Sequence, residues 1–464
     1  MLQLDNHGTK PYYVQIYEYF RDEIESRRLP AGEKMTSVRD LAQAVNISKM
    51  TVEKAYYQLA SEGYIIHRNK ARYEVASLGD YRESGAERRT TYTEPSRPAY
   101  SYDFGSGDMD MEHFPLDTWR KSMNHVLSEP ARLLSCSDEQ GVQELRQVLS
   151  QYVYQTRGVY ADSGHIVIGT GTLSLLSILM TLLGDTYDAI GVENPGFRRG
   201  REIFRNRGFE IHPISVIDGM MDLQALTESG SRLVYVSPSH QFPTGTVMPA
   251  GMRHRLLQWA DEQDGMIIED DYDSELRYYG RPVPALQGLD THSRVIYMGS
   301  LSKVLPPFVR LSYMVLTDAL LEQYNQNREL FRQGASIPEQ LVLAEYIRSG
   351  ELGRQIRRLR KDYQEKGNYL KKLLTEAFGE RIDVSQLTSG VYCRVVLKSP
   401  WSAEELQKRA EGQGCRVLSM KSFYENKGHE DSREFLLSFS KIPSHDLNDA
   451  VATLRRAWLE KEGS

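Results

Sequence analysis

The stretch GSLSKVLPPFVRLSYMV, residues 299–315, sets a single lysine, Lys303, among groups that bind phosphate. Ser300 and Ser302 flank it with hydroxyls, and Arg310 follows with a guanidinium. A lone lysine is usually a solvated surface charge. This one comes directly after the apolar run RVIYMG, and ligands of open α/β sheets bind where strands end. A desolvated, deprotonated amine in such a place can form a Schiff base with an aldehyde.

Pyridoxal phosphate is the aldehyde cofactor that this chemistry fits, and it needs a carboxylate facing its pyridine nitrogen. The stretch GMIIEDDYDSELRYYG supplies Asp270 at the end of another apolar run, with Tyr272 on the same side to reach the ring oxygen O3′. An acidic run is also typical of a solvated strand end or a metal site, and the pairing with Lys303 favours the pyridoxal role. In SPSHQFPTG, either His240 or Gln241 could face the cofactor, and the sequence does not decide between them.

Two further turns could complete the site. IVIGTGTLSLLSIL predicts a strand, a glycine turn and a helix start, so the N–H groups of Gly171 and Thr172 can bind the phosphate. VENPGFRRG places Phe197 to stack on the pyridine ring and Arg199 to receive an effector carboxylate. A core phenylalanine beside a surface arginine is the alternative interpretation.

Strands that alternate with helices must position these residues. From about Tyr102 onward, short apolar runs stand between helical stretches, which is typical of an α/β domain with a mainly parallel sheet covered on both faces. A polar helical tract over about 335–378 and the runs SGVYCRVVL, GCRVLSM and EFLLSFS predict a smaller α+β domain within about 318–464. The effector domain as a whole is expected over 102–464.

Residues 1–76 predict a separate module of helices followed by a hairpin. Two apolar faces, separated by the turn NIS, have helix-turn-helix spacing. Ser48 is expected to cap the second helix, which places Lys49, Met50, Thr51 and Lys54 on its exposed first turns, where a recognition helix meets DNA. Between positions 34 and 72 there are seven Lys or Arg and three acidic residues, a net charge of +4. The alternative is a three-helix bundle with a solvated basic face.

The bulk composition limits the classes of protein. A chain of 464 residues with 26% charged residues and a net charge of -6 is expected to be a globular protein with several domains and a local DNA-binding patch. No segment has the length and hydrophobicity of a signal peptide or membrane span, so we expect a cytoplasmic location. Three cysteines without ligand spacing make a disulfide framework or metal site unexpected. Residues 77–101, rich in Gly, Ser, Thr, Pro and charge, predict a linker.

Residues 35–76 resemble the winged helix of the GntR family, through MTSVRDLA and the recognition-helix stretch ISKMTVEKAYYQLASEGYI. That resemblance implies binding to double-stranded promoter DNA. The residues it implies as DNA contacts are Ser37, Arg39, Ser48, Lys49, Thr51 and Lys54, with Arg68 and Lys70 in the wing. HRNKARYEV departs from the usual Gly-x-Gly wing of the family.

The remaining motifs resemble a fold-type I aminotransferase domain, and the two modules in this order resemble the MocR-type (GabR-like) regulators of the GntR family. The resemblance implies a head-to-tail, domain-swapped homodimer and a pyridoxal phosphate site. It further implies that an amine, amino acid or dipeptide effector displaces Lys303 in an external aldimine, contacts Arg199 and alters DNA binding. The other readings are a working aminotransferase with an accessory DNA-binding domain and a regulator that senses pyridoxal phosphate itself.

The chain departs from the aminotransferase pattern in a late strand. Where such enzymes carry an arginine that clamps the substrate α-carboxylate, REFLLSFS places Leu436, although Arg433 lies three residues earlier and could reach the effector. The departure favours a regulator with at most residual transaminase activity.

Overall fold

A computed structural model describes residues 2, 4–5, 10–68, 72–78, 100–134, 138–280, 283–425 and 432–459. The chain divides into two compact units, Met1–Ser96 and Arg97–Ser464. The linker predicted over 77–101 lies outside the described residues except at its ends.

The first unit is a three-helix winged module, as the sequence predicts. Its helices are α1 (Tyr12–Glu25), α2 (Val38–Ala44) and α3 (Lys49–Ser61), and the hairpin strands are β1 (Ile65–Arg68) and β2 (Arg72–Val75). Phe20 and Tyr56 pack edge to face at 5.7 Å between ring centroids, and Ile16 and Leu59 are fully buried beside them. Gly63, with φ of 80°, turns the chain from α3 into β1.

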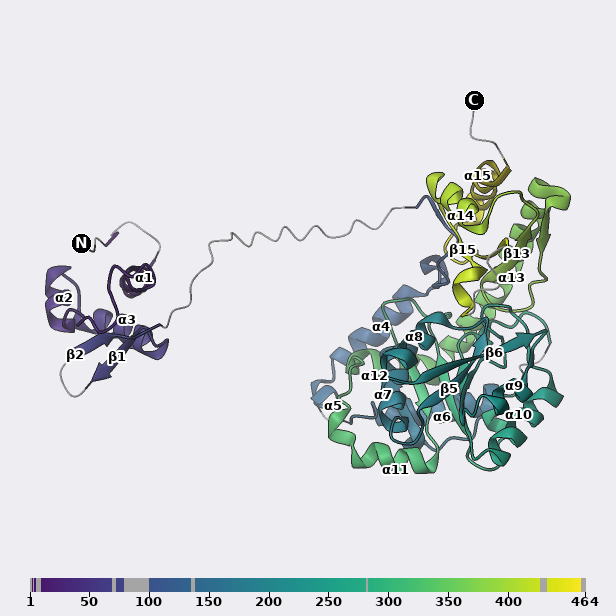
Figure 1. The fold of residues 1–464 in the computed structure, drawn as a ribbon, viewed down its shortest axis with the longest axis horizontal. Coiled ribbons are helices and arrows are strands. Elements are labelled where there is room, and N and C mark those ends of the chain that lie inside the picture. Colours follow the sequence, from purple (N-terminus) through teal and green to yellow (C-terminus); the bar gives the residue numbers. More distant parts are fainter. Residues whose placement is uncertain are drawn as a thin grey trace. The chain divides into compact units, whose positions relative to one another are not determined.

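A mainly parallel sheet organises the second unit (Figure 1). Its strands in the described part of the chain lie in the order β4-β11-β10-β9-β8-β5-β6-β7, with β11 and β7 antiparallel to their neighbours. Their bounds are β4 (Ile166–Gly169), β5 (Ala189–Asn194), β6 (Glu210–Ile217), β7 (Met220–Met221), β8 (Leu233–Val236), β9 (Met266–Asp271), β10 (Val295–Ser300) and β11 (Ser312–Val315). The fold class predicted from sequence is confirmed.

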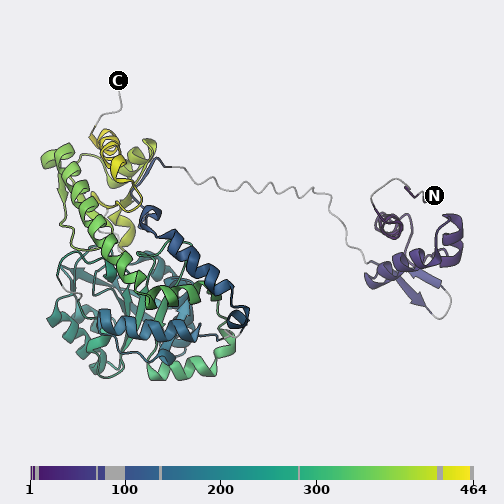
Figure 2. The same cartoon turned by 180° about the vertical axis from the view of Figure 1, so that it is seen from behind.

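Helices cover both faces of this sheet, which explains why its strands are nearly continuous apolar runs. One face packs on α7 (Thr172–Leu183), α8 (Arg198–Asn206) and α11 (Asp318–Gln326). The other packs on α6 (Gln143–Arg157), α9 (Leu223–Glu228), α10 (Ala250–Glu262) and α12 (Ile337–Arg348), with α4 (Leu116–Leu127) against α12. Figure 2 shows α4 and the long α13 from behind. Because β4, β10 and β9 run in the same direction, their carboxyl ends meet at one edge of the sheet.

A smaller antiparallel sheet follows, in the order β12-β13-β16-β15. Its strands are β12 (Ile382–Val384), β13 (Tyr392–Leu397), β15 (Leu418–Ser419) and β16 (Glu434–Ser438). The helices α13 (Glu351–Phe378), α14 (Ala403–Gly412) and α15 (Leu447–Leu459) pack on one of its faces. A short parallel pair joins β14 (Cys415–Arg416) to β3 (Tyr102–Asp103), the first strand of the second unit.

Three elements differ from the expectations. Strand β6 was not predicted, because its run EIHPISVI contains a proline and is interrupted by polar residues. The helical tract over 335–378 is two helices, since Gly350 has φ of 76° between α12 and α13. Helix α11, placed by sequence in the small domain, packs through Leu320 and Tyr324 on the large sheet.

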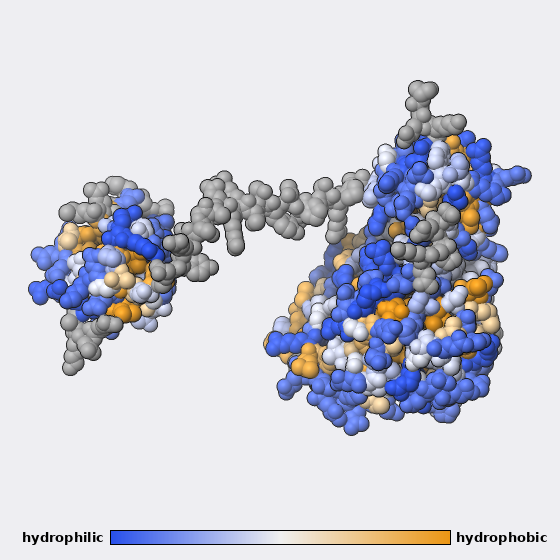
Figure 3. Space-filling view, viewed as in Figure 1, coloured by the Kyte–Doolittle hydropathy of each residue, from blue (hydrophilic) through white to orange (hydrophobic). Residues whose placement is uncertain are grey.

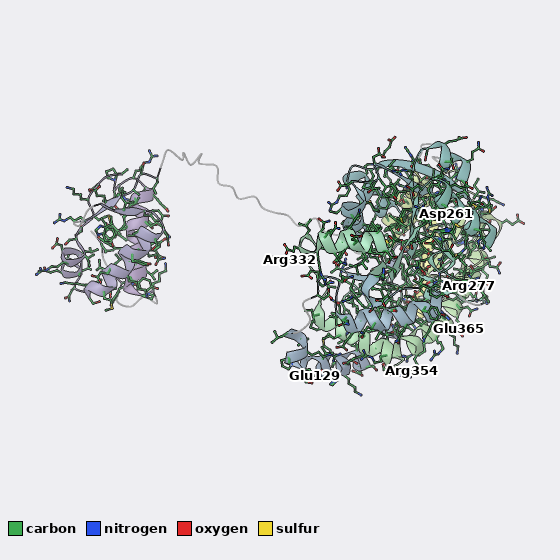
Figure 4. The ribbon with its side chains drawn as sticks, turned by 90° about the horizontal axis from the view of Figure 1, so that it is seen from below. Glu129, Asp261, Arg277, Arg332, Arg354 and Glu365 are labelled. Carbon is green, nitrogen blue, oxygen red and sulfur yellow. The ribbon has the colours of Figure 1, made fainter. Side chains whose placement is uncertain are left out.

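Most of the visible surface of the second unit is hydrophilic (Figure 3). Charged side chains such as Glu129 and Arg354 lie on its outer parts (Figure 4), with 43% and 54% of their side chains exposed. Within the described residues no helix has the length and apolar character needed to cross a membrane.

Candidate cofactor pocket and nucleic-acid interface

A cavity of about 600 Å³ lies where the carboxyl ends of the large-sheet strands face the small sheet. It brings together eight of the residues singled out from sequence: Thr172, Phe197, Arg199, Asp270, Tyr272, Ser300, Ser302 and Lys303. These residues come from four separate segments of the chain, so their convergence is a property of the fold.

Lys303 lies in the turn after β10, and its amine points to the segment that enters the second unit. Nζ donates a hydrogen bond to the carbonyl oxygen of Gly107 at 2.8 Å and lies 5.4 Å from the ring centroid of Tyr392. A Cβ on Gly107 would lie 1.9 Å from the hydroxyl oxygen of Tyr392 and 2.8 Å from Lys303 Nζ. Only glycine at 107 therefore permits this arrangement of lysine and tyrosine.

Asp270, at the end of β9, has one oxygen satisfied and one facing no donor. The hydroxyl of Tyr235 donates to Oδ2, whereas Oδ1 is buried without a hydrogen-bond partner in the part of the chain that the structure describes. Only 6% of the residue is exposed, and burial raises the pKa of its carboxyl to about 7. Such an oxygen is suited to accept a hydrogen bond from a protonated ring nitrogen.

The neighbouring acids of this run point away from the cavity. Asp271 accepts from Arg157 Nε at 2.6 Å and from the Tyr297 hydroxyl at 2.7 Å. Asp273 pairs with His240 Nδ1 at 2.8 Å. The Tyr272 hydroxyl lies 3.1 Å from the same His240 nitrogen, so His240 holds Tyr272 from behind. Burial raises the pKa of Tyr272 well above its usual range, which keeps the hydroxyl a donor.

Hydroxyl groups and a helix start form an anion-binding corner. Ser300 and Ser302 have their Oγ atoms 3.0 Å apart, and Ser312 Oγ lies 3.2 Å from Ser300 Oγ. Gly171, with φ of 126°, begins α7, so the N–H groups of the first turn are directed to this corner. Arg310 is exposed, and its guanidinium lies 3.9 Å from the ideal Cβ position of Gly171.

Five residues singled out from sequence do not line this cavity, namely Gly171, Arg310, His240, Gln241 and Arg433. His240 lines a smaller neighbouring cavity behind Tyr272. Gln241 turns its amide to the carbonyl oxygens of Pro195 and Phe242, at 2.8 Å each. Arg433 donates from Nε to the carbonyl oxygen of Trp401 at 2.9 Å, which directs it away from the lysine. Arg199 lines the cavity, but its side chain is exposed at the rim.

The residues of the cavity fit pyridoxal phosphate. Lys303 provides the amine, Asp270 Oδ1 the buried acceptor for the ring nitrogen, and Phe197 an apolar wall for the ring. The serine hydroxyls and the start of α7 provide donors for a phosphate. The donor set contains no cluster of metal ligands among the described residues.

Sequence reasoning missed other residues of the site. Tyr235 contacts Asp270 from β8, Ser237 and Tyr392 line the cavity, and Arg416 lines it from β14. Ser237 begins the stretch SPSHQFPTG, and the other three stand in short strand runs whose spacing indicates no role. The segment DFGSGDMD carried the one usable signal, because glycine at 107 between polar residues is typical of a close backbone approach.

Of the residues expected to meet DNA, the winged module exposes Arg39, Ser48, Lys49 and Lys54, whereas Ser37 and Thr51 are half-buried. Ser37 and Ser48 cap α2 and α3, since their Oγ atoms accept from Asp40 N and Thr51 N. Arg39 and Lys49 are exposed, and Met50, beside Lys49, is 77% exposed. Thr51 Oγ1 lies 2.8 Å from Ser48 Oγ, so these two hydroxyls are occupied with the helix cap.

Three of the expected contacts have other surroundings or lie outside the described residues. Lys54 Nζ lies 3.9 Å from the ring centroid of Tyr13, which holds it against α1. The side chain of Arg68 and the whole of Lys70 lie outside the described residues. Arg39 and Lys49 are therefore the best-defined basic groups on the recognition face.

Comparisons with known proteins agree with this architecture. Residues 12–75 match the family of bacterial regulatory proteins of the gntR type, and residues 101–453 match the class I and II aminotransferase family. The uncharacterised HTH-type transcriptional regulator YdeL of Bacillus subtilis is 37% identical over 97% of each chain. The pyridoxine biosynthesis transcriptional regulator PdxR of Corynebacterium glutamicum is 30% identical over 80% of this chain and 81% of its own.

Solved structures resemble the second unit. The α-aminoadipate aminotransferase LysN of Thermus thermophilus, solved with N-(5'-phosphopyridoxyl)-L-leucine, is 25% identical with a TM-score of 0.68. The match covers 76% of this chain and 91% of that one.

Proposed function

The chain belongs to the MocR-type regulators of the GntR family, in which a GntR DNA-binding domain precedes an aminotransferase class I and II domain, and we propose that it regulates transcription in response to a primary amine bound at Lys303. Bound pyridoxal phosphate supplies an aldehyde carbon to which Lys303 or an effector amine can be joined. The effector is an amine, amino acid or dipeptide. The observation that carries the proposal is the hydrogen bond from Lys303 to Gly107.

Gly107 belongs to the entry segment, residues 102–110, which directly follows the predicted linker. This segment is tied to the small domain, because Tyr102 N donates to Gly414 O at 3.1 Å and Phe104 O accepts from Ser438 N at 2.7 Å. It then reaches the cavity, where Gly107 O accepts from Lys303. Loss of the hydrogen bond from Lys303 would therefore change the contacts of the entry segment, which continues from the predicted linker.

The joint between the large and small sheets offers the second route for the signal. Gly390, in the loop before β13, packs so closely that a Cβ would lie 2.6 Å from Asp273 and 2.7 Å from His240. The Gly390 N–H donates to Leu276 O at 3.0 Å. Since His240 also contacts Tyr272, an effector that displaces Tyr272 would shift this joint and change the orientation of the small domain.

A homodimer is part of this proposal. Met111, Leu116, Leu127 and Leu134 are exposed on the region around α4, and 86% of Leu134 is accessible. Exposed apolar side chains gathered in one region are typical of a protein interface. A head-to-tail dimer would bring two winged helices to paired half-sites. Light scattering of the purified chain would give twice the mass of 53.2 kDa.

A second candidate function is sensing of pyridoxal phosphate itself, and the observation that favours it is the similarity to PdxR, a pyridoxine biosynthesis regulator. In that case the cofactor alone changes DNA binding, and no amine is required. A third candidate, an active aminotransferase, is disfavoured because Leu436 stands where the carboxylate clamp is expected, in an apolar cluster.

One experiment separates the three. The full chain is loaded with pyridoxal phosphate, its visible absorbance is recorded, and primary amines are titrated with and without DNA selected in vitro for binding. The proposal expects an amine-dependent change in both absorbance and DNA affinity, absent in Lys303→Ala. DNA binding that responds to the cofactor alone supports the second candidate, and steady formation of a keto acid supports the third.

A further inference from the structure

The recognition helix α3 exposes a methionine in its first turn. Met50 stands between Lys49 and Thr51, and 77% of it is exposed. It is the most exposed large apolar residue in the described part of the first unit. A single exposed apolar side chain on an ordinary surface needs no explanation. Met50 lies instead on the surface that is expected to meet the bases of DNA, where its chemistry bears on which bases are bound.

Helix α3 has an apolar core face and an exposed face opposite to it. The core face consists of four fully buried residues at helical spacing: Val52, Ala55, Tyr56 and Leu59. The opposite face has the same spacing and consists of four exposed residues: Met50, Glu53, Lys54 and Tyr57. The apolar core of the winged module forms without Met50. Its apolar side chain is therefore not explained by packing within this module.

The polar groups around Met50 are engaged in the helix cap or held against α1. The hydroxyls of Ser48 and Thr51 lie 2.8 Å apart, and Ser48 Oγ accepts from the Thr51 N–H at 3.2 Å. Lys54 Nζ lies 3.9 Å from the centroid of a tyrosine ring on α1. The N-terminal residues of a recognition helix are the ones that contact base edges. Lys49 supplies a charge there, and Met50 supplies a neutral, apolar group beside it.

The major groove of DNA offers one apolar group, the 5-methyl group of thymine. A thioether donates no hydrogen bond and accepts only weakly, so it cannot replace the water on the polar edge of another base. Packed against a methyl group, both partners are removed from water. The unbranched methionine side chain can adapt its shape to such a contact. The exposed Arg39 and Lys49 supply the attraction for the phosphates on either side.

We propose that Met50 packs on the 5-methyl group of a thymine in the major groove and so selects thymine at one position of the DNA site. The proposal rests on the DNA binding of the proposed function and goes beyond it, because it names a base and the side chain that recognises it. Cytosine has no methyl group at this place, so Met50 discriminates between the two pyrimidines.

Replacement of thymine by deoxyuridine tests the inference, because the two bases differ only by the methyl group. The full chain first selects duplexes from a random pool, and the thymines of the selected site are then replaced one at a time. Fluorescence anisotropy at one fixed salt concentration gives the dissociation constant of each duplex. For at least one position, wild-type protein is expected to bind the deoxyuridine duplex about fourfold more weakly, the effect of one methyl group removed from water. Met50→Ala should bind both duplexes of that pair equally.

Two control variants separate the methyl contact from a general loss of binding. Met50→Leu keeps an apolar side chain and should retain the weaker binding of the deoxyuridine duplex. Tyr57→Ala removes another exposed side chain, 73% accessible, from the same face two turns later and should also retain it. The same penalty in Met50→Ala as in wild type, or no penalty in wild type at any thymine, overturns the inference and leaves the proposed function standing. Failure of the full chain to select any duplex contradicts both.

Discussion

Lys303 Nζ donates a hydrogen bond to the carbonyl oxygen of Gly107 at 2.8 Å, across 196 residues of chain. The hydrogen bond joins the amine that lines the cavity to the segment that begins the second unit. It also places the lysine 5.4 Å from the ring centroid of Tyr392, on the small sheet. Three parts of the fold, the large sheet, the small sheet and the entry segment, therefore meet at one amine.

Lys303→Ala should abolish the visible absorbance of cofactor-loaded protein and the response of DNA binding to amines. No other lysine lines the cavity among the described residues, so no replacement amine stands in reach. DNA binding without effector should remain, since the winged module folds around its own core. Absorbance spectra and fluorescence anisotropy with labelled DNA measure these outcomes, and an unaltered spectrum would refute the assignment of Lys303.

Gly107→Ala should weaken cofactor retention by about tenfold or more, because its Cβ would overlap Tyr392 and press on Lys303. Gly105→Ala is the matched control in the same segment. Its Cβ would meet Arg416 Nε at 3.1 Å and Arg416 Cγ and Asp103 Oδ1 at 3.2 Å, which are side-chain contacts that small movements relieve. Equilibrium dialysis of the cofactor compares the two variants. Equal retention by both would show that close packing at 107 does not matter.

Asp270→Asn should raise the dissociation constant of pyridoxal phosphate at least about tenfold, because a neutral amide cannot stabilise a protonated ring nitrogen. Tyr235→Phe removes the donor to Oδ2 and leaves Oδ1 unchanged, so its effect should be smaller. The cofactor titration monitored by absorbance checks both. A larger loss in Tyr235→Phe would place the ring nitrogen elsewhere.

The cofactor-free chain should lose stability as the pH rises from about 4 to about 7. Burial raises the pKa of Asp270 to about 7 from a usual value of 3.8, so the folded state holds a proton that the unfolded state has released. Burial raises the pKa of Glu193 and of Glu269 to about 7 as well, which acts in the same direction. Asp270→Asn should reduce the slope by up to about 1.4 kcal/mol per pH unit. Urea unfolding at several pH values measures it.

The control for that slope is Asp117→Asn. Asp117 lies on α4 with 85% of its side chain exposed and pairs with Arg120 at 2.7 Å. Its removal should leave the slope of wild-type protein in place. A slope that changes equally in both variants would mean that the buried carboxyl of Asp270 is not its source.

Lys49→Ala should weaken DNA binding about equally across sequences and lower the salt dependence by about one counterion, because it removes one exposed charge from the first turn of α3. Lys54→Ala is the comparison within the same helix. Lys54 is held over the Tyr13 ring, so a smaller effect on binding and some loss of stability are expected. Anisotropy titrations at several salt concentrations distinguish them.

The sequence by itself determined the two-module organisation, the helix-turn-helix, the mainly parallel sheet and the cofactor chemistry. The apolar runs that end in Asp270 or precede Lys303 are local patterns, and so is Ser48 before the recognition helix. Local patterns of this kind can be recognised from the sequence alone. Strand β6 was not predicted, because a proline and polar residues interrupt its apolar pattern.

Only the tertiary structure decided what surrounds those residues. The bond from Lys303 to Gly107, the donation from Tyr235 to Asp270, and the orientation of Arg433 towards Trp401 all join segments distant in sequence. The apolar surroundings of Leu436 likewise depend on which face of β16 meets Phe242 and Phe423. Contacts of this kind arise from packing between separate elements. The local pattern of residues along the chain does not show which distant segments will meet.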